Sequence, residues 1–188
     1  MRLISEIRYK RNMEPYKIEK IEKLYDTYSK RLYFTSLRII GNECEAEEVV
    51  QDTFLKYFNC PDKAKIQNIE SWLVSICVRA SIDVVRKRKR EKEFINEYSD
   101  EELSKEKMFE PETQTICRDT KMGIVKKALM SLPDTLRIIL SLHLIEGFDY
   151  EEIVNITGLN GNTIRSRYMR GREKLAIELK TMIKELNN

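Results

Sequence analysis

The chain has 188 residues, of which 41% are hydrophobic and 35% charged, so it can form one or two packed domains and is too apolar to be disordered throughout. Its net charge of +3 conceals a division: residues 1–92 carry 20 basic and 14 acidic side chains, residues 93–115 carry 2 and 8, and residues 116–188 carry 12 and 9, which predicts two polyanion-binding modules around an acidic connector. Four cysteines without C-x-x-C spacing and a single histidine argue against a metal site, and because no apolar run reaches about 18 residues, we expect no membrane insertion.

Two helices are predicted at the start of the chain. Residues 17–40 repeat apolar side chains at spacings of three, four and seven, as one face of a helix does. Gly41 is expected to end this helix, at the position that glycine prefers after a helix C-terminus. Asn42 is expected to cap a second helix that runs to about Phe58, with Glu45 as its capping-box partner.

A polar loop, residues 60–68, and a third helix follow. The third helix is expected from Ile69 to Lys92, with Trp72 on its apolar stripe and packed in the core. Its last residues, RKRKREK at 86–92, include six basic side chains and one acidic one. Such a run is typical either of a contact with a polyanion or of a merely solvated surface.

The acidic connector, residues 93–112, loses helical periodicity and is predicted to be a flexible linker. Periodicity returns from Ile116 to Leu132, and a further helix is expected from Asp134 to about Leu144, closed by Gly147. The few glycines and prolines and the absence of β alternation favour an all-α fold. The sequence therefore predicts two small helical domains, residues 1–92 and 113–188, joined by this linker.

Residues 149–175 predict a helix-turn-helix. Asp149 can cap a short helix, with Glu152 in the capping-box position. Gly158 supplies the turn, and Asn160 can cap a second helix. A short helix, a turn of about three residues that contains glycine, and a second helix form the motif that places one helix in the major groove of DNA.

The second of these helices divides into two faces. Ile164, Tyr168, Gly171 and Leu175 are expected to pack inward, and Gly171 would allow another helix to come close. The exposed first turns hold side chains that can meet base edges and phosphates, and the candidate DNA contacts are Asn162, Thr163, Arg165, Ser166, Arg167, Met169 and Arg170. Residues 160–174 contain five basic groups and one acid, whereas a solvated face normally mixes signs, so the pattern favours DNA binding.

The whole chain resembles an extracytoplasmic-function (ECF) sigma factor of the sigma-70 family, over roughly residues 18–90 and 113–180. Sigma region 4 is similar to the C-terminal part, ALMSLPDTLRIILSLHLIEGFDYEEI followed by GLNGNTIRSRYMRGREKL. Sigma region 2 is similar to the N-terminal part, LYDTYSKRLYFTSLRIIGNECEAEEVVQDTFLKYF followed by SWLVSICVRASIDVVRKRKR. The resemblance implies a bacterial cytoplasmic protein that is not an enzyme, needs no cofactor or metal, and serves RNA polymerase in recognising and melting promoters.

The resemblance also implies partners for particular segments. Core RNA polymerase, through its β′ clamp coiled coil and its β flap, is an expected partner, and the expected clamp contacts on the second helix are Glu48, Gln51, Asp52 and Lys56. The −10 element is expected to meet the loop and the third helix, at Lys63, Lys65, Gln67, Asn68, Arg79, Arg86, Arg88 and Arg90. The chain departs from the family at Ala80, where members often carry Asn, and this suggests a different −10 preference.

Promoter DNA is the second expected partner, an anti-sigma factor is a hypothesis, and the free chain is expected to be a monomer. The family's −35 and −10 elements lie about 17 base pairs apart, which is about 58 Å, and a linker of 20 residues reaches at most about 66–72 Å. Two alternatives differ in class. A free-standing helix-turn-helix regulator should be a symmetric dimer, but no dimerisation heptad is evident. A nucleic-acid enzyme should show a P-loop, a metal-spaced cluster or a nucleophile with its base, and none is found.

Overall fold

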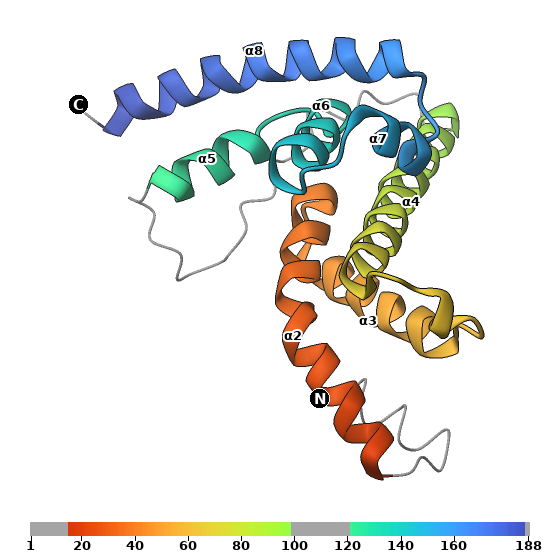
Figure 1. Cartoon of the computed structure of the whole chain (residues 1–188). Coiled ribbons are helices and arrows are strands. Elements are labelled where there is room, and N and C mark those ends of the chain that lie inside the picture. Colours follow the sequence, from red (N-terminus) through yellow and green to blue (C-terminus); the bar gives the residue numbers. More distant parts are fainter. Residues whose placement is uncertain (1–14, 99–120, 187–188) are drawn as a thin grey trace.

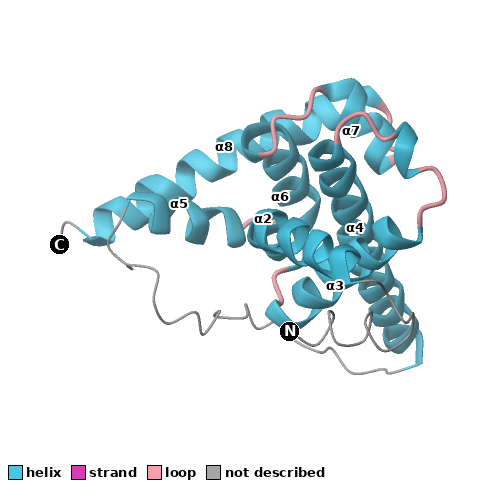
Figure 2. Ribbon diagram, turned by 60° about the horizontal axis from the view of Figure 1, so that its bottom comes forward, coloured by secondary structure: helices cyan, strands magenta, loops and turns pink. Residues whose placement is uncertain are grey.

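A computed structural model describes residues 15–98 and 121–186 (Figure 1). These residues form helices joined by short loops, with no strand among them (Figure 2), which confirms the all-α prediction. In chain order the elements are α2 (Pro15–Ile40), α3 (Glu43–Asn59), the 3₁₀ turn η1 (Lys63–Lys65), α4 (Ile69–Tyr98), α5 (Lys121–Met130), α6 (Asp134–Leu140), the π-helical turn η2 (Ser141–Ile145), α7 (Tyr150–Thr157) and α8 (Gly161–Leu186). None of these helices is both long and apolar enough to cross a membrane.

Helices α2, α3 and α4 pack on one another around an apolar core. Leu32 of α2 and Phe54 of α3 are at most 1% exposed, and the ring centroids of Tyr25 and Phe54 lie 4.9 Å apart. Trp72 is half-buried and meets the Tyr57 ring edge-on at 5.7 Å. The apolar stripe that the sequence predicts on the third helix is therefore a packing surface.

The predicted boundary between α2 and α3 is confirmed, and one of its capping contacts differs. Gly41 follows α2 with a φ of +75°, and Asn42 Oδ1 accepts a hydrogen bond from Glu45 N at 3.0 Å. The Glu45 carboxylate pairs with Arg88 of α4, in place of the predicted capping-box contact. The Glu45 side chain thus forms a long-range ion pair instead of the contact at the helix end that the capping-box pattern predicts.

Helix α4 is longer than predicted, because it ends at Tyr98 and not at Lys92. Ion pairs one turn apart, Lys87–Glu91 at 3.8 Å and Lys89–Glu93 at 3.5 Å, link the basic run to the first acidic residues and support the helix there. Residues 93–98 of the predicted linker are therefore helical. Residues 99–112 of that linker, and the predicted periodicity over residues 116–120, lie outside the described residues.

Helix α8 runs along α5, α6 and α7 and packs on all three (Figure 1). The helix predicted over residues 134–144 begins as expected but changes at Ser141 into the π-helical turn η2. There the backbone N–H of Glu146 donates to Ser141 O, five residues earlier, at 3.1 Å. Gly147, with a φ of +78°, ends the turn. The periodicity of apolar residues could not predict the π turn, because such a turn changes the number of residues in a single helical turn only.

The two predicted domains are in direct contact. Helix α6 and η2 pack on α2, and α7 packs on α4. Buried side chains of both halves, such as Ile39 and Val78 of the first and Ile139 and Ile153 of the second, belong to one continuous apolar cluster. The sequence predicts a tether between the halves but not this contact, since periodicity tells which face of a helix is buried and not what covers it.

Candidate nucleic-acid interface

The helix-turn-helix forms as predicted. Asp149 Oδ1 accepts from Glu152 N at 2.8 Å and Glu152 Oε2 accepts from Asp149 N at 2.9 Å, so both halves of the capping box are present. Gly158 ends α7 with a φ of +69°, a left-handed conformation in which a side chain would be strained. Asn160 Oδ1 accepts from Asn162 N at 2.8 Å at the start of α8. Local hydrogen bonds therefore fix both helix starts around the turn.

Helix α8 buries one face and exposes the other. Ile164 is 0% exposed, and a Cβ on Gly171 would lie 3.1 Å from Leu140 of α6, so glycine permits the predicted close approach. Thr163 and Arg167 are half-buried, and the other candidate DNA contacts are exposed: Asn162, Arg165, Ser166, Met169 and Arg170. The exposed five follow helical spacing, so they lie on one outward face. Their contact with DNA stays a prediction.

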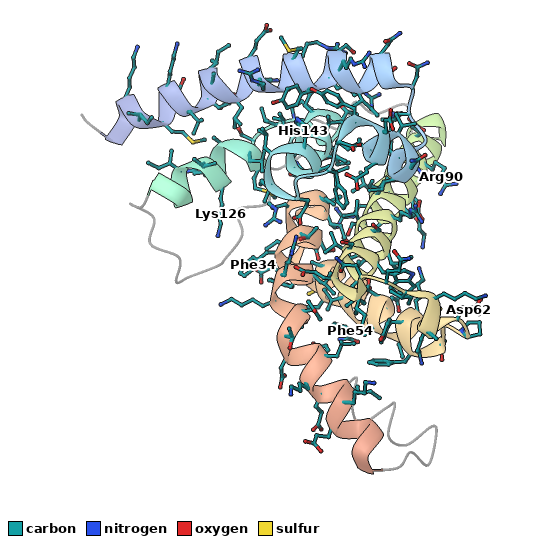
Figure 3. The ribbon with its side chains drawn as sticks, in the orientation of Figure 1. Phe34, Phe54, Asp62, Arg90, Lys126 and His143 are labelled. Atoms are coloured by element: carbon teal, nitrogen blue, oxygen red, sulfur yellow. The ribbon has the colours of Figure 1, made fainter. Side chains whose placement is uncertain are left out.

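An aromatic cluster beneath the first turns of α8 was not predicted. The rings of His143 and Tyr150 stack at 4.8 Å, and Tyr168 meets them edge-on at 4.9 and 5.9 Å. His143, which Figure 3 shows below α8, donates from Nδ1 to Phe148 O at 2.8 Å. The Arg165 guanidinium lies 5.9 Å from the Tyr150 ring centroid, so the cluster helps to orient a candidate DNA contact. Its rings come from three elements, and no single helical period shows them together.

The loop before α4 holds four candidate contacts, and two of them also support the loop. Asn68 Oδ1 accepts from Ser71 N at 3.0 Å and thereby caps α4. Lys63 Nζ donates to a backbone carbonyl near the end of α3 at 2.8 Å. Lys65 and Gln67 are exposed. An exposed loop between two packed helices can meet a nucleic-acid strand without disturbing the core.

The four candidate arginines of α4 differ in how they are engaged. Arg79 and Arg90 are exposed, and Figure 3 shows Arg90 projecting from the bundle. Arg86 donates to a backbone carbonyl at the end of α7 at 2.5 Å. Arg88 donates to a carbonyl at the end of α2 at 3.0 Å and pairs with Glu45, and desolvation lowers its pKa. Arg86 and Arg88 thus stabilise the fold, whatever contacts they make with DNA.

The residues predicted to bind polymerase share the outer face of α3. Glu48, Asp52 and Lys56 are exposed and Gln51 is half-buried. Residues four apart on a helix are neighbours, so the three exposed side chains form one row, with two acidic side chains followed by a basic one. Such a row can pair with a charged partner helix.

Comparisons with known proteins agree with this two-part arrangement. The family model of Sigma-70 region 2 matches residues 24–91, and that of Sigma-70, region 4, matches residues 122–175. SigV, an RNA polymerase sigma factor of Bacillus subtilis, is 30% identical over 148 residues, which cover 78% of this chain and 83% of SigV. The chain belongs to the sigma-70 family.

Two further relatives define the branch of this sigma factor. SigE of Mycolicibacterium smegmatis, an ECF RNA polymerase sigma factor, is 32% identical over 155 residues, and the match covers 82% of this chain but 59% of SigE. The sigma factor RpoE of Bartonella quintana, solved in complex with the anti-sigma factor NepR, matches with a TM-score of 0.58 at 25% identity and covers 86% of this chain and 98% of that one. The function is that of an ECF RNA polymerase sigma factor, and the protein is not an enzyme.

In this sigma factor the region 2 match lies within α2–α4 and the region 4 match within α5–α8, so we call these two groups of helices region 2 and region 4. Two charged residues between the regions were missed by the sequence analysis. Arg137 of α6 is 6% exposed, and the Glu146 side chain after η2 is 2% exposed. For Arg137 a signal was present, because it stands among the apolar residues LRIIL of its helix. For Glu146, in a loop between two helices, no sequence signal pointed to burial.

Proposed function

We propose that this sigma factor binds core RNA polymerase in the bacterial cytoplasm and directs it to promoters, with α8 at the −35 element and α4 with its preceding loop at the −10 element. The outward face of α8 carries this proposal. It presents Asn162, Arg165, Ser166 and Arg170 on a helix whose start is capped and whose inner face is packed. A rigid helix with an arginine-rich outer face suits the major groove of DNA.

Two arginines of α8 have different proposed roles. Arg165 lies in the second turn, where recognition helices meet base edges, and its side chain is exposed beside the Tyr150 ring, where it is free to pair with guanine. Arg170 lies more than one turn later, and its Nε donates to Ser166 O at 3.3 Å. From there it suits a phosphate, a contact that positions the helix without specifying a sequence.

At the −10 element the proposed partner is a single strand. Capturing one strand requires bases to be unstacked, at a cost of a few kcal/mol for a flipped base. The exposed Lys65, Gln67, Arg79 and Arg90 supply a polar and basic route along the loop and α4. The same loop and helix also hold four candidate contacts that are hydrogen-bonded within the protein, as described above: Lys63, Asn68, Arg86 and Arg88. A basic groove that follows the backbone is the usual means of holding a single strand.

The outer face of α3 is proposed to bind the β′ clamp coiled coil of core polymerase, and the β flap is a second proposed contact. Glu48, Asp52 and Lys56 are exposed there, and Gln51 stands beside them. We also propose an anti-sigma factor as a partner, because the similar sigma factor RpoE of Bartonella quintana was solved in complex with one.

Run-off transcription with purified core polymerase on fragmented host DNA tests this function. Adding the sigma factor should yield discrete transcripts that core polymerase alone does not make, and these transcripts would reveal the promoters. If RNA synthesis is the same with and without the chain, the proposed function is wrong. Tight binding of operator DNA by a dimer, without polymerase, would favour a free-standing regulator instead.

A pair of variants tests the assignment of α8. Arg165→Ala should cost about 1–3 kcal/mol in binding the −35 element and relax base preference at one position. Arg170→Ala, the matched control on the same face, should weaken binding to all sequences alike and reduce the salt slope by about one unit. Competition binding with single-base variants of the −35 element, at two salt concentrations, separates these effects. Equal behaviour of both variants contradicts the assignment.

A further inference from the structure

Arg165 contacts a ring that belongs to the other helix of the helix-turn-helix. Its guanidinium carbon lies 5.9 Å from the centroid of the Tyr150 ring, and Tyr150 is the first residue of α7. The Arg165 side chain is otherwise exposed. An exposed arginine has many rotamers, and it loses part of this freedom when it pairs with a base. A contact that directs the side chain beforehand therefore favours the pairing.

The Tyr150 ring is itself held in place by its neighbours. The capping box of Asp149 and Glu152 fixes the backbone directly before it. The His143 ring stacks on the Tyr150 ring, with the centroids 4.8 Å apart and the planes inclined by 18°. The Tyr168 ring meets the same ring edge-on, at 5.9 Å and 72°. The half-buried Tyr150 ring cannot turn away without losing these contacts.

His143 is held in turn by the π-helical turn η2 and the segment after it. The imidazole donates from Nδ1 to Phe148 O at 2.8 Å, and Phe148 N donates to Leu142 O at 3.0 Å, so the segment folds back on the turn. Figure 3 shows His143 below α8. Since π turns are rare and frequent at functional sites, it is notable that this one supplies the ring on which Tyr150 stacks.

The contact of Arg165 is one end of a continuous row of five side chains. In spatial order these are Arg165, Tyr150, His143, Tyr168 and Arg172. At the far end, the Arg172 guanidinium lies 5.7 Å from the Tyr168 ring centroid. Tyr168 and Arg172 belong to the same helix, four residues apart, whereas Tyr150 and Arg165 belong to different helices. The place of Arg165 therefore depends on how α7, η2 and α8 pack together.

We propose that Tyr150, held by His143, is a positioning residue for promoter recognition, whose ring orients the Arg165 guanidinium toward one base of the −35 element. This inference rests on the proposed function, in which Arg165 meets a base edge. Tyr150 and His143 lie outside α8, and their proposed role needs no contact of their own with DNA. They act on the choice of base through Arg165.

The chemistry of the guanidinium suits this arrangement. The group is planar, and its N–H donors lie in its plane. A guanidinium that lies against an aromatic ring therefore keeps its in-plane donors free for two parallel hydrogen bonds to guanine. At an exposed site the attraction between cation and ring changes an equilibrium about two- to fivefold. This is enough to favour one direction of the side chain and too little to prevent its pairing with a base.

Competition binding by the holoenzyme tests this role. Each full-length variant is combined with core polymerase, and the probes are a promoter found by run-off transcription and its single-base variants in the −35 element. Tyr150→Leu should reduce discrimination between bases about two- to fivefold. The loss should fall at the one position that Arg165→Ala also relaxes. The salt dependence of binding should stay unchanged, because Tyr150→Leu removes no charge.

Three further variants separate positioning from a general loosening of the fold. Tyr150→Phe, the matched control, keeps the ring and should discriminate like the wild type. Val154→Ala trims another half-buried side chain of α7, and it should lower thermal stability without relaxing that position. Combined with Arg165→Ala, Tyr150→Leu should cause no further loss of discrimination, as expected for two coupled residues.

The positioning role is overturned if folded Tyr150→Leu keeps wild-type discrimination at the position that Arg165→Ala relaxes. An equal loss in Tyr150→Phe also overturns it, because the hydroxyl would then be the group that acts. Should Tyr150→Leu fail to fold, NMR of the wild-type chain decides. The ring current should shift the δ-methylene protons of Arg165 upfield of those of Arg170, and equal shifts count against the contact.

Failure of the proposed function looks different. If Arg165→Ala relaxes no position of the −35 element, the proposed base contact of Arg165 is wrong, whatever Tyr150 does. If the wild-type chain gives no transcripts in the run-off experiment, the proposed function itself is wrong. The positioning role alone fails only where Arg165→Ala has its expected effect and Tyr150→Leu has none.

Discussion

Region 2 and region 4 bury their apolar residues in different ways. Region 2 has a core of its own, in which three long helices enclose side chains such as Phe54 and Leu73. Among the described residues of region 4, Leu129, Leu132 and Leu140 form a separate buried cluster, while Ile139 and other buried residues join the core of region 2. The comparison indicates that region 2 is stable by itself and that region 4 gains part of its stability from docking.

The basic residues of the two regions also differ in how far they are engaged by other parts of the protein. On α8, Arg165 contacts an aromatic ring and Arg170 a backbone carbonyl of its own helix, and both side chains are exposed. On α4, Arg86 is bonded to region 4 and Arg88 to the end of α2. The proposed −35 surface is therefore accessible in the free chain, whereas part of the proposed −10 surface is engaged within the protein.

The largest expected effect comes from truncating a large buried side chain in the core of region 2. Phe54 is 0% exposed and packs on Tyr25, so Phe54→Ala should lower the free energy of unfolding by about 3–5 kcal/mol. Since region 4 is docked on this core, both regions should unfold together at the lower urea concentration. Urea unfolding followed by circular dichroism and by Trp72 fluorescence, which reports on region 2, measures this.

The control for this variant is Phe58→Ala. Phe58 stacks near Phe54 on the same helix at 6.2 Å but is half-buried, so its loss should cost less. If Phe54→Ala leaves region 4 with its wild-type stability, then region 4 does not depend on region 2, and the comparison is wrong.

A smaller effect is expected from crowding the contact between α6 and α8. A Cβ at Gly171 would lie 3.1 Å from Leu140, which is 0% exposed and has little room to move. Overpacking costs about 1–3 kcal/mol, and the gain in helix propensity offsets about 1 kcal/mol of it. Gly171→Ala should therefore destabilise region 4 by up to about 2 kcal/mol and leave region 2 folded.

Gly161→Ala is the matched control within the same helix, because a Cβ there would meet its nearest neighbour, Val154, at an ordinary 3.9 Å. Thermal unfolding should separate the two variants, with a lower first transition for Gly171→Ala alone. Equal stability of both variants would show that the Leu140 side chain moves aside, and that the contact between α6 and α8 is less tightly packed than the structure indicates.

Local rules predicted much of this structure, and contacts between distant residues account for what they missed. The capping box of Asp149, the cap of Asn160 and the turn at Gly158 each depend on residues a few positions apart, and all three are present. The extension of α4 beyond Lys92 depended on ion pairs within one helix, which the acidic composition of the connector concealed. The docking of region 4, with Glu146 against α2, joins residues more than a hundred positions apart, and no periodicity in either segment encodes the pairing.

The pH dependence of stability should report on region 2 through Cys77. Burial raises the pKa of this thiol from 9.0 to about 12, and its Sγ donates to Leu32 O at 3.5 Å. Above pH 9 the unfolded chain therefore loses a proton that the folded chain retains. The resulting stability is fully present below pH 9 and falls by about 1.4 kcal/mol per pH unit as the pH rises toward 12.

Urea unfolding at pH 8 and pH 10 measures this loss of stability, with Cys77→Ala as the control that lacks the thiol. The wild-type chain should lose about 1.4 kcal/mol more than the variant between these two values, and the loss should appear in the transition of region 2. A variant with the same pH dependence as the wild type would mean that the thiol is less buried than the structure shows.

The smallest effect, and the sharpest use of the comparison, comes from removing one cap in each region. Asn42 caps α3 through Glu45 N at 3.0 Å, and Asp149 caps α7 through Glu152 N at 2.8 Å. Asn42→Ala and Asp149→Ala should each cost about 1 kcal/mol, since each removes one side-chain cap. The chemistry is the same in both regions, so any difference in outcome reports how the stability of one region depends on the other.

Because region 4 gains part of its stability from docking on region 2, Asn42→Ala should lower the stability of both regions, whereas Asp149→Ala should lower that of region 4 alone. Residue-level hydrogen exchange distinguishes the two patterns, and identical patterns would mean that the regions depend on each other equally.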